Sequence, residues 1–565
     1  MTILNAQDPV IGYRLPEQIM NLSRMGSFHQ NRLSFMRTLL RRVHDQKWDF
    51  ETVRFEIDVK GVGVAVYSAK GPRNTYSLVA FANDLLPEKR SDRVIATEWD
   101  ATFTLFDGEP SDLDIERLRN NVPLQESGRV TESELSLSRA NRSVRLWDHV
   151  VSSLSEGVQP DTTLVKNVGY LMRTTAVYGS GKFGVADREL LSERSECRGP
   201  FQIEMLTVFL IRTFVMDLVE HIAKMKSPKT AVKIDPVLRR RFGIGNSTGL
   251  GMAPFLINHP MLINNWLLAK EEALSRVRNV DFPTPAEIKI FKNLLPRVVQ
   301  NTNDWHTIHP VQLQKLAHLK NDLDFLSKQV ERVDFSAAYP WNKLYLWSEE
   351  NLSLEGQEQL VSLMMEPYPD LVDGLAHCMD ADEAKGFRID GTMSVSKLKS
   401  LCEDIYNWAL EIDWSQKEAN ARAWYVSEEK LEPRLGERFS EDIEDYEQPL
   451  QPGRDVSRMY HDLRDCSDAQ TTAAFLLANP EHRHSARRCQ LAAKFQFAEI
   501  RDNMIDAKMM PIDLLRAKLS FFGAGHFDPR SDRWLRINMF QGAPFPSELQ
   551  ESYCDDWTYP VAERP

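Results

Sequence analysis

The β-strand pattern of this chain lies in four runs: VRFEIDV (53–59), VGVAVYS (62–68), YSLVAF (76–81) and VIATEWDATFTLF (94–106). In each run apolar residues alternate with polar ones or dominate, and β-branched and aromatic residues are frequent, which favours strands over helices. Gly61, Gly71-Pro72 and Asp107-Gly108 punctuate the runs, as turn residues do. Because a helical pattern precedes them, the runs predict a small antiparallel sheet packed on a helix.

Beyond about residue 138 the apolar spacing becomes helical, and it stays helical for most of the chain. Thr284-Pro285 is typical of a helix start, and Pro433 of a helix stop. The expected helices are 139–156, 161–177, 200–225, 260–279, 285–299, 310–331, 354–366, 393–431 and 481–506. No regular alternation of strand and helix follows the N-terminal runs, so a doubly wound nucleotide-binding fold is not expected.

The fold class predicted from these patterns is mainly α: a multi-helix body with a small N-terminal α+β module. Three domains are expected. The first is the small α+β domain of residues 1–125. A helical core domain over 126–390 carries two glycine-rich segments, and a helical C-terminal region with a wrapping tail occupies 391–565.

Composition sets limits on the class of protein. The 565 residues have a net charge of −12, with 42% hydrophobic and 27% charged residues, so no global field attracts nucleic acid. The most apolar stretch, 203–222, is interrupted by charged residues, which predicts a core helix and no membrane span. The chain start lacks a signal-peptide pattern, and six cysteines occur without a CxxC pair. These features predict a soluble cytoplasmic protein without nucleic-acid or membrane partners; homo-oligomerisation is left open.

Two glycine-rich segments stand out: RTTAVYGSGKFGVADR (173–188) and RRRFGIGNSTGLGMAP (239–254). Each combines backbone freedom, short hydroxyl or amide side chains and positive charge. A protein needs these properties to bring N–H groups and cations close to an anion. The two segments therefore mark the predicted ligand site.

The first segment resembles a phosphate-binding P-loop only superficially. Ala176 stands where the motif needs its first glycine, Phe183 follows Lys182 in place of Ser or Thr, and a helix is expected before the segment. On the expected helix 161–177, Arg173 lies on the face that runs toward the glycines. Arg173, Lys182 and Arg188 are therefore candidates to surround one anion. The alternative is a glycine helix cap followed by a solvated loop.

The second segment has the spacing GxGxxxGxG, which differs from the dinucleotide-binding GxGxxG. Its backbone N–H groups over 243–249 are expected to cradle the anion, while Asn246, Ser247 and Thr248 orient it and Arg241 adds charge. The predicted binding residues of this segment are Arg241, Gly245, Asn246, Ser247, Thr248 and Gly249. The alternative is a buried crossing of loop and helix that requires small residues.

Two residues are candidates for proton transfer. Glu204 falls on the apolar side of the helix 200–225, together with Arg212, so both are expected to be buried in an internal network. His259 follows the second segment and is suited to act as a general base or hydrogen-bond donor. Cys197, beside an arginine before a helix start, is a weaker nucleophile candidate. Histidine and cysteine spacings indicate no metal site.

These residues favour an enzyme acting on a small anionic metabolite, with the reaction class left unknown. Lys182, Arg173 and Arg241 would neutralise a carboxylate or phosphate, and His259 or Glu204 would move a proton. One alternative fills the same pocket with a flavin, a nucleotide or acyl-CoA. Another is a non-catalytic helical scaffold, which predicts an exposed apolar patch on the 393–431 helix.

Overall fold

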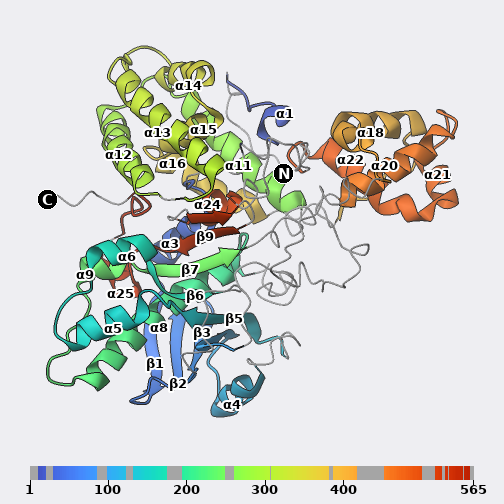
Figure 1. Cartoon of the computed structure of the whole chain (residues 1–565). Coiled ribbons are helices and arrows are strands. Elements are labelled where there is room, and N and C mark those ends of the chain that lie inside the picture. Colours follow the sequence, from blue (N-terminus) through green and yellow to red (C-terminus); the bar gives the residue numbers. More distant parts are fainter. Residues whose placement is uncertain are drawn as a thin grey trace. The chain divides into compact units, whose positions relative to one another are not determined.

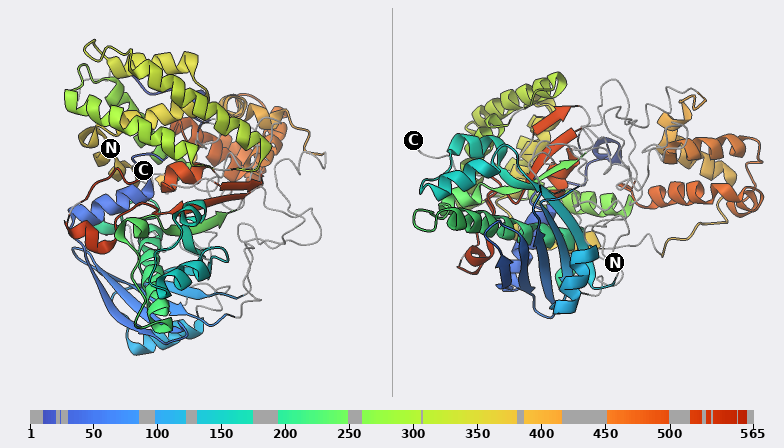
Figure 2. Two further views of the ribbon diagram at one scale, coloured as in Figure 1. Left: turned by 60° about the vertical axis from the view of Figure 1, so that its left-hand side comes forward. Right: turned by 60° about the horizontal axis from the view of Figure 1, so that its bottom comes forward.

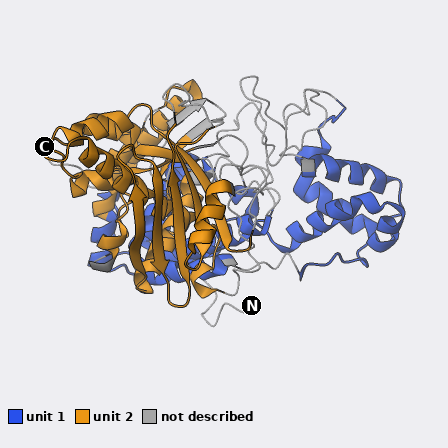
Figure 3. Ribbon diagram, turned by 90° about the horizontal axis from the view of Figure 1, so that it is seen from below, with its two compact units in different colours: residues 1–27, 250–291, 328–517 blue, residues 28–249, 292–327, 518–565 orange. Residues whose placement is uncertain are grey.

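The computed structural model describes residues 11–20, 24, 30–85, 98–121, 131–174, 194–248, 260–305, 307–380, 386–415, 451–498, 516–524, 528–531, 534–551 and 553–559. Two units group these residues by their contacts (Figure 3). Unit 1 comprises Met1–Ser27, Leu250–Phe291 and Lys328–Ala517, and unit 2 comprises Phe28–Gly249, Lys292–Ser327 and Lys518–Pro565. Contacts alone do not test which segments fold independently, so the three-domain division stays a prediction.

Unit 2 contains a nine-stranded mixed sheet with the strand order β1-β2-β3-β4-β5-β6-β7-β9-β8 (Figure 1). Its strands are β1 (Asp49–Ile57), β2 (Gly63–Lys70), β3 (Thr75–Ala82), β4 (Ala101–Asp107), β5 (Glu134–Arg142), β6 (Tyr170–Thr174), β7 (Gly243–Thr248), β8 (Asp528–Ser531) and β9 (Trp534–Met539). The expected small, antiparallel N-terminal sheet is therefore wrong. Strands from residue 49 to residue 539 share one sheet, and β6 and β7 are parallel.

The four predicted N-terminal strand runs correspond to β1–β4, whose long neighbouring arrows are blue in Figure 2. β2 and β3 are buried on both faces, because alternate residues contact different partners. On one face Val64 and Val66 of β2 join a cluster with Leu118 of α4 (Asp112–Asn121). On the other, Tyr67 packs edge-on against Phe214 of α8 (Gln202–Lys226).

The sheet continues where a helix was expected. The expected helix 161–177 is only α6 (Thr162–Val168), because Gly169 ends it with a left-handed φ of 71°. β6 begins at the next residue. The 25-residue helix α8 then lies between β6 and the parallel strand β7 in the chain, as a parallel connection requires.

The tail of the chain also belongs to unit 2. β9 pairs with β7, so the sheet gains its last two strands from residues after 527. Further along, Asp555 forms ion pairs with Arg37 and Arg41 of α3 (Phe35–Asp45). The predicted wrapping tail is thus partly an integral element of the sheet.

Unit 1 contains helices, among them α11 (Pro260–Arg278), α14 (Pro340–Asn351), α15 (Leu354–Met365), α16 (Pro369–Val372) and η4 (Asp373–Asp380). A further group has its own core: α18 (Val395–Leu410), α20 (Gln451–Arg464), α21 (Thr472–Ala478) and α22 (Arg483–Lys494). The apolar stripe of α18 is buried in that core, including Leu398 and Ile405. The exposed patch that the scaffold alternative predicts is therefore not found on α18.

The remaining helices include two long ones, α12 (Pro285–Asn303) and α13 (Pro310–Val330), and several short ones. The short ones are α1 (Pro16–Ile19), α5 (Trp147–Ser155), η3 (Ser195–Cys197), α9 (Pro236–Arg240), η6 (Pro480–His482), α24 (Ala517–Phe522) and α25 (Pro546–Glu551). In the described part of the chain, every helix is too short or too polar to cross a bilayer.

Candidate functional site

The two glycine-rich segments meet in the sheet of unit 2. β6 and β7 pair in parallel, with Arg173 opposite Gly245 and Thr174 opposite Asn246. The side-chain amide of Asn246 donates a hydrogen bond to the carbonyl of Thr174 at 3.2 Å. Both segments therefore continue from the carboxyl ends of neighbouring parallel strands. In open α/β sheets this edge is where ligands bind.

Glu204 belongs to the helix that connects these two strands. The start of α8 packs against α3: the ring of Phe201 stacks on that of Phe35, and the side-chain amide of Gln202 donates to the carbonyl of Phe35. Glu204 is in the first turn of α8 and is only 5% exposed. Arg173 is equally buried. A buried cation thus belongs to β6, and a buried carboxyl group belongs to the helix that connects β6 with β7.

Close packing explains two glycines of the second segment. A Cβ atom at Gly245 would lie 2.7 Å from the ring of Tyr170, and one at Gly243 would lie 2.6 Å from the carbonyl of Met539. Gly243, Gly245 and Asn246 pair with β6, and residues 244–248 pair with β9, so this backbone serves the sheet. Strand pairing and close packing favour a structural role for Gly243 and Gly245, and the expected anion cradle of 243–249 stays a prediction.

Arg241 follows α9 directly and stands two residues before β7, and its place in the predicted cation cluster stays a prediction. Ser247 and Thr248 contribute backbone to β7. Lys182, Arg188, Gly249 and His259 lie outside the described residues.

Arg212 has a different role from the ion pairing that its apolar position suggested. Its fully buried guanidinium donates hydrogen bonds to the carbonyls of Phe242 at 2.7 Å, Ala543 at 2.9 Å and Arg240 at 3.1 Å. It also stacks over the ring of Phe545, 3.9 Å from its centroid. Burial lowers its pKa to about 9. Arg212 thereby fixes the entry to β7 against the segment that follows β9.

Cys197 is unsuited to be a nucleophile. Its thiol is buried and donates to the hydroxyl of Tyr76 at 3.0 Å. Burial raises the pKa of Cys197 to about 11, so the reactive thiolate is scarce near neutral pH.

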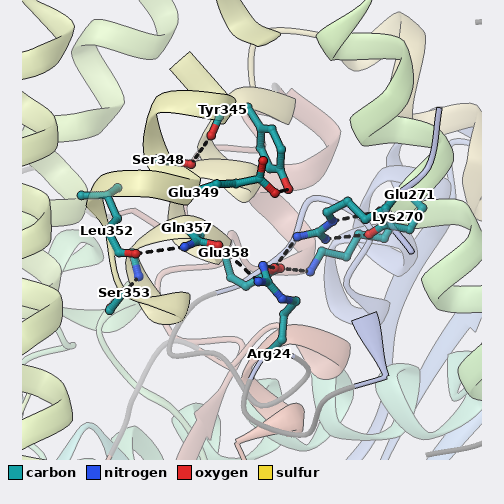
Figure 4. A network of polar contacts seen from close by, with 12 residues as sticks. Arg24, Lys270, Glu271, Tyr345, Ser348, Glu349, Leu352, Ser353, Gln357 and Glu358 are labelled. Atoms are coloured by element: carbon teal, nitrogen blue, oxygen red, sulfur yellow. Dashed lines mark hydrogen bonds and ion pairs between the residues drawn. The ribbon is translucent and has the colours of Figure 1, made fainter. Parts of the chain in front are cut away.

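A second polar centre, which sequence reasoning missed, lies in unit 1 (Figure 4). We call it the Glu358 cluster: Arg14, Arg24, Lys270, Glu271 and Glu358. Glu358 of α15 accepts hydrogen bonds from Arg14 at 2.5 Å, Arg24 at 2.8 Å and Lys270 at 2.5 Å. Glu271 binds Arg14 through both carboxylate oxygens. The signal in the sequence was the charged run Lys270-Glu271-Glu272, which follows the apolar residues Trp266-Leu267-Leu268-Ala269 in the same helix.

Burial and charge oppose each other in the Glu358 cluster. Burial alone would raise the pKa of Glu358, but Arg14, Lys270 and Arg24 outweigh it and hold that pKa well below its usual value. Burial would likewise lower the pKa of Arg14, yet Glu271 and Glu358 raise it well above normal. Arg14 and Glu358 are therefore both charged at neutral pH.

Comparisons with known proteins identify no relative: no family model, curated protein or solved structure matches the chain. Within the described residues, no group of three or more His, Cys, Asp or Glu side chains is placed to hold a metal ion.

Proposed function

We propose that the protein is a cytoplasmic enzyme acting on a small anionic metabolite, bound where β6 and β7 end. The observation that carries the proposal is the parallel pairing of Arg173 with Gly245, from which both glycine-rich segments continue. All six cysteines lie in described parts of the chain and none forms a disulfide, which agrees with a reducing compartment.

In this proposal Arg173, Lys182 and Arg188 supply the positive charge for a carboxylate or phosphate. Arg173 is buried at the end of β6, where the low local dielectric strengthens its attraction for an anion. Glu204, in the first turn of α8, or His259 would move a proton. Asn246 holds the strands together through Thr174, so we assign it to positioning.

The proposal is tested first with what the protein carries when purified. Native mass spectrometry, followed by denaturation and mass analysis of released molecules, separates a small metabolite from the alternative occupants, a flavin, a nucleotide or acyl-CoA. The native mass also gives the oligomeric state.

The second test uses inorganic phosphate and acetate as probes in calorimetric titrations. Lys182→Ala is expected to weaken binding of the preferred probe at the strand edge at least ~10-fold, because one charge-assisted contact is lost. The control is Lys229→Ala, which removes an exposed lysine of the same unit and is expected to bind like the wild type. Unchanged binding by Lys182→Ala would refute the assigned role of the first segment.

A further inference from the structure

The Glu358 cluster of unit 1 holds more positive than negative charge. Three cations, Arg14, Arg24 and Lys270, share two carboxylates, Glu271 and Glu358. The side chains of Glu271 and Glu358 are fully buried, and that of Lys270 is 4% exposed. Burying a charge without a counter-charge is costly, so an excess cation here needs a partner.

Among the described residues, two cations of α11 close to the cluster, Arg276 and Arg278, are engaged with other groups. Arg276 pairs with Glu272 at 2.7 Å. The guanidinium of Arg278 lies 4.1 Å from the ring centroid of Tyr345, whose hydroxyl donates to Glu349 at 2.7 Å. Arg278 also donates to the side chain of Asn342 at 2.9 Å, so neither arginine adds a carboxylate to the cluster, which keeps its surplus among the described residues.

Unsatisfied donors accompany the surplus charge. Among the described residues the ammonium of Lys270, which has three N–H donors, has one hydrogen-bond acceptor, Glu358. Ser362 is one helical turn beyond Glu358, on the same side of α15. Its buried hydroxyl, like the side-chain amide nitrogen of Gln359, has no hydrogen-bond partner within the described part of the protein.

We propose that the Glu358 cluster is a binding site for a small oxyanion, a carboxylate or a phosphate, distinct from the site proposed at β6 and β7. The ligand would neutralise the surplus charge, with Lys270 as its principal cation and Ser362 donating a hydrogen bond. Figure 4 shows how Arg24 and Lys270 approach Glu358 from different elements. A ligand there would tie α11, α15 and the N-terminal segment together.

The deciding variant is Lys270→Met, which keeps the length of the side chain and removes its charge. Arg14 and Arg24 then balance Glu271 and Glu358. We expect Lys270→Met to melt no lower than the wild type in buffer without phosphate or carboxylates. It should also lose at least ~10-fold in affinity for inorganic phosphate or acetate, whichever binds the wild type. The two probes distinguish a phosphate ligand from a carboxylate one.

Controls separate this site from the other one. Lys343→Met removes an exposed lysine of α14 and should leave binding and melting unchanged. Lys182→Ala should retain binding at the Glu358 cluster, so failure of either proposal is visible independently. A lower melting temperature of Lys270→Met, with neither probe binding the wild type, would show a closed structural ion network and overturn the proposal.

A second variant covers the case in which Lys270→Met does not fold. Ser362→Ala deletes one unpartnered hydroxyl, so its melting temperature should equal or exceed that of the wild type. Its affinity for the preferred probe should fall several-fold. Binding that Ser362→Ala leaves unchanged would contradict the placement of the ligand beside α15.

Discussion

At the scale of single residues, Arg212 shows how a charge is retained in a core without a carboxylate. Its guanidinium presents donors in a fixed fork, and three backbone carbonyls accept them. The aromatic ring of Phe545 covers its face. The sequence predicted that Arg212 is buried, because it falls on the apolar side of a helix. The sequence could not identify the partners of Arg212, because every residue has a backbone carbonyl and the residue type does not show which carbonyls accept.

Replacing Arg212 by methionine is expected to lower the free energy of unfolding of unit 2 by about 3 kcal/mol, because three buried carbonyls lose their donors. Arg212→Lys should recover only part of the loss, since one ammonium cannot reproduce the fork. Urea unfolding measures the change. Arg73→Met, at an exposed position between β2 and β3, is the control and should be neutral. A fully stable Arg212→Met would show that the three contacts contribute little.

At the scale of elements, β7 is the strand that sequence reasoning mistook for a loop. Four glycines in nine residues predicted unusual backbone geometry, yet 243–248 form an extended strand that pairs with β6 as far as Asn246 and with β9 over 244–248. Gly243 and Gly245 are needed because neighbouring groups approach too closely for a side chain. Local composition cannot separate these two causes of glycine usage, because both require the absence of a Cβ atom.

Gly245→Ala is expected to destabilise unit 2 by about 1–3 kcal/mol, because the new methyl group meets the buried ring of Tyr170. In a Tyr170→Leu background the same substitution should cost less, since the ring has been removed. The double-mutant cycle therefore predicts coupling between the two positions. Gly374→Ala, where no atom lies within 4 Å of the added Cβ, is the control. Strictly additive effects would disprove this explanation of Gly245.

The helix α8 illustrates what periodicity predicts well. Its observed bounds, Gln202–Lys226, agree with the expected helix 200–225, and α11, α13 and α15 agree similarly. The prediction of one helix over 161–177 was wrong, because the apolar spacing of this segment also fits a short helix followed by a strand. Gly169, whose left-handed conformation ends α6, was the available signal.

At the scale of the whole molecule, the chain of unit 2 is closed by contacts between its distant ends. Asp555 lies 3.1 Å from Arg37 and 2.8 Å from Arg41, across more than 500 residues of sequence. Burial alone would raise the pKa of Asp555, but Arg37, Arg41 and Arg32 outweigh it and lower that pKa to about 2. The ionised carboxylate therefore stabilises the folded form.

The stability contributed by the ion pairs of Asp555 should depend on pH. Because the folded pKa of Asp555 lies below the unfolded value, its contribution is full above the unfolded pKa and is lost as pH falls toward 2. The contribution amounts to about 2 kcal/mol. Asp555→Asn should therefore have a lower melting temperature than the wild type at neutral pH. Calorimetry should find that this difference in melting temperature shrinks as the pH falls from 4 to 2. The control is Asp45→Asn, at the exposed end of α3. If the difference in melting temperature between Asp555→Asn and the wild type did not depend on pH, the prediction would be contradicted.

The sequence by itself determined the positions of β1–β4, of most long helices and of the two segments that meet at β6 and β7. These features depend on apolar periodicity and turn residues within short windows, which act locally. Only the tertiary structure decided that β6, β7 and β9 join the N-terminal strands, and that Arg14 and Arg24 converge on Glu358 in a separate centre. Strand pairing and buried ion pairs are made between residues hundreds of positions apart, so no local pattern records them.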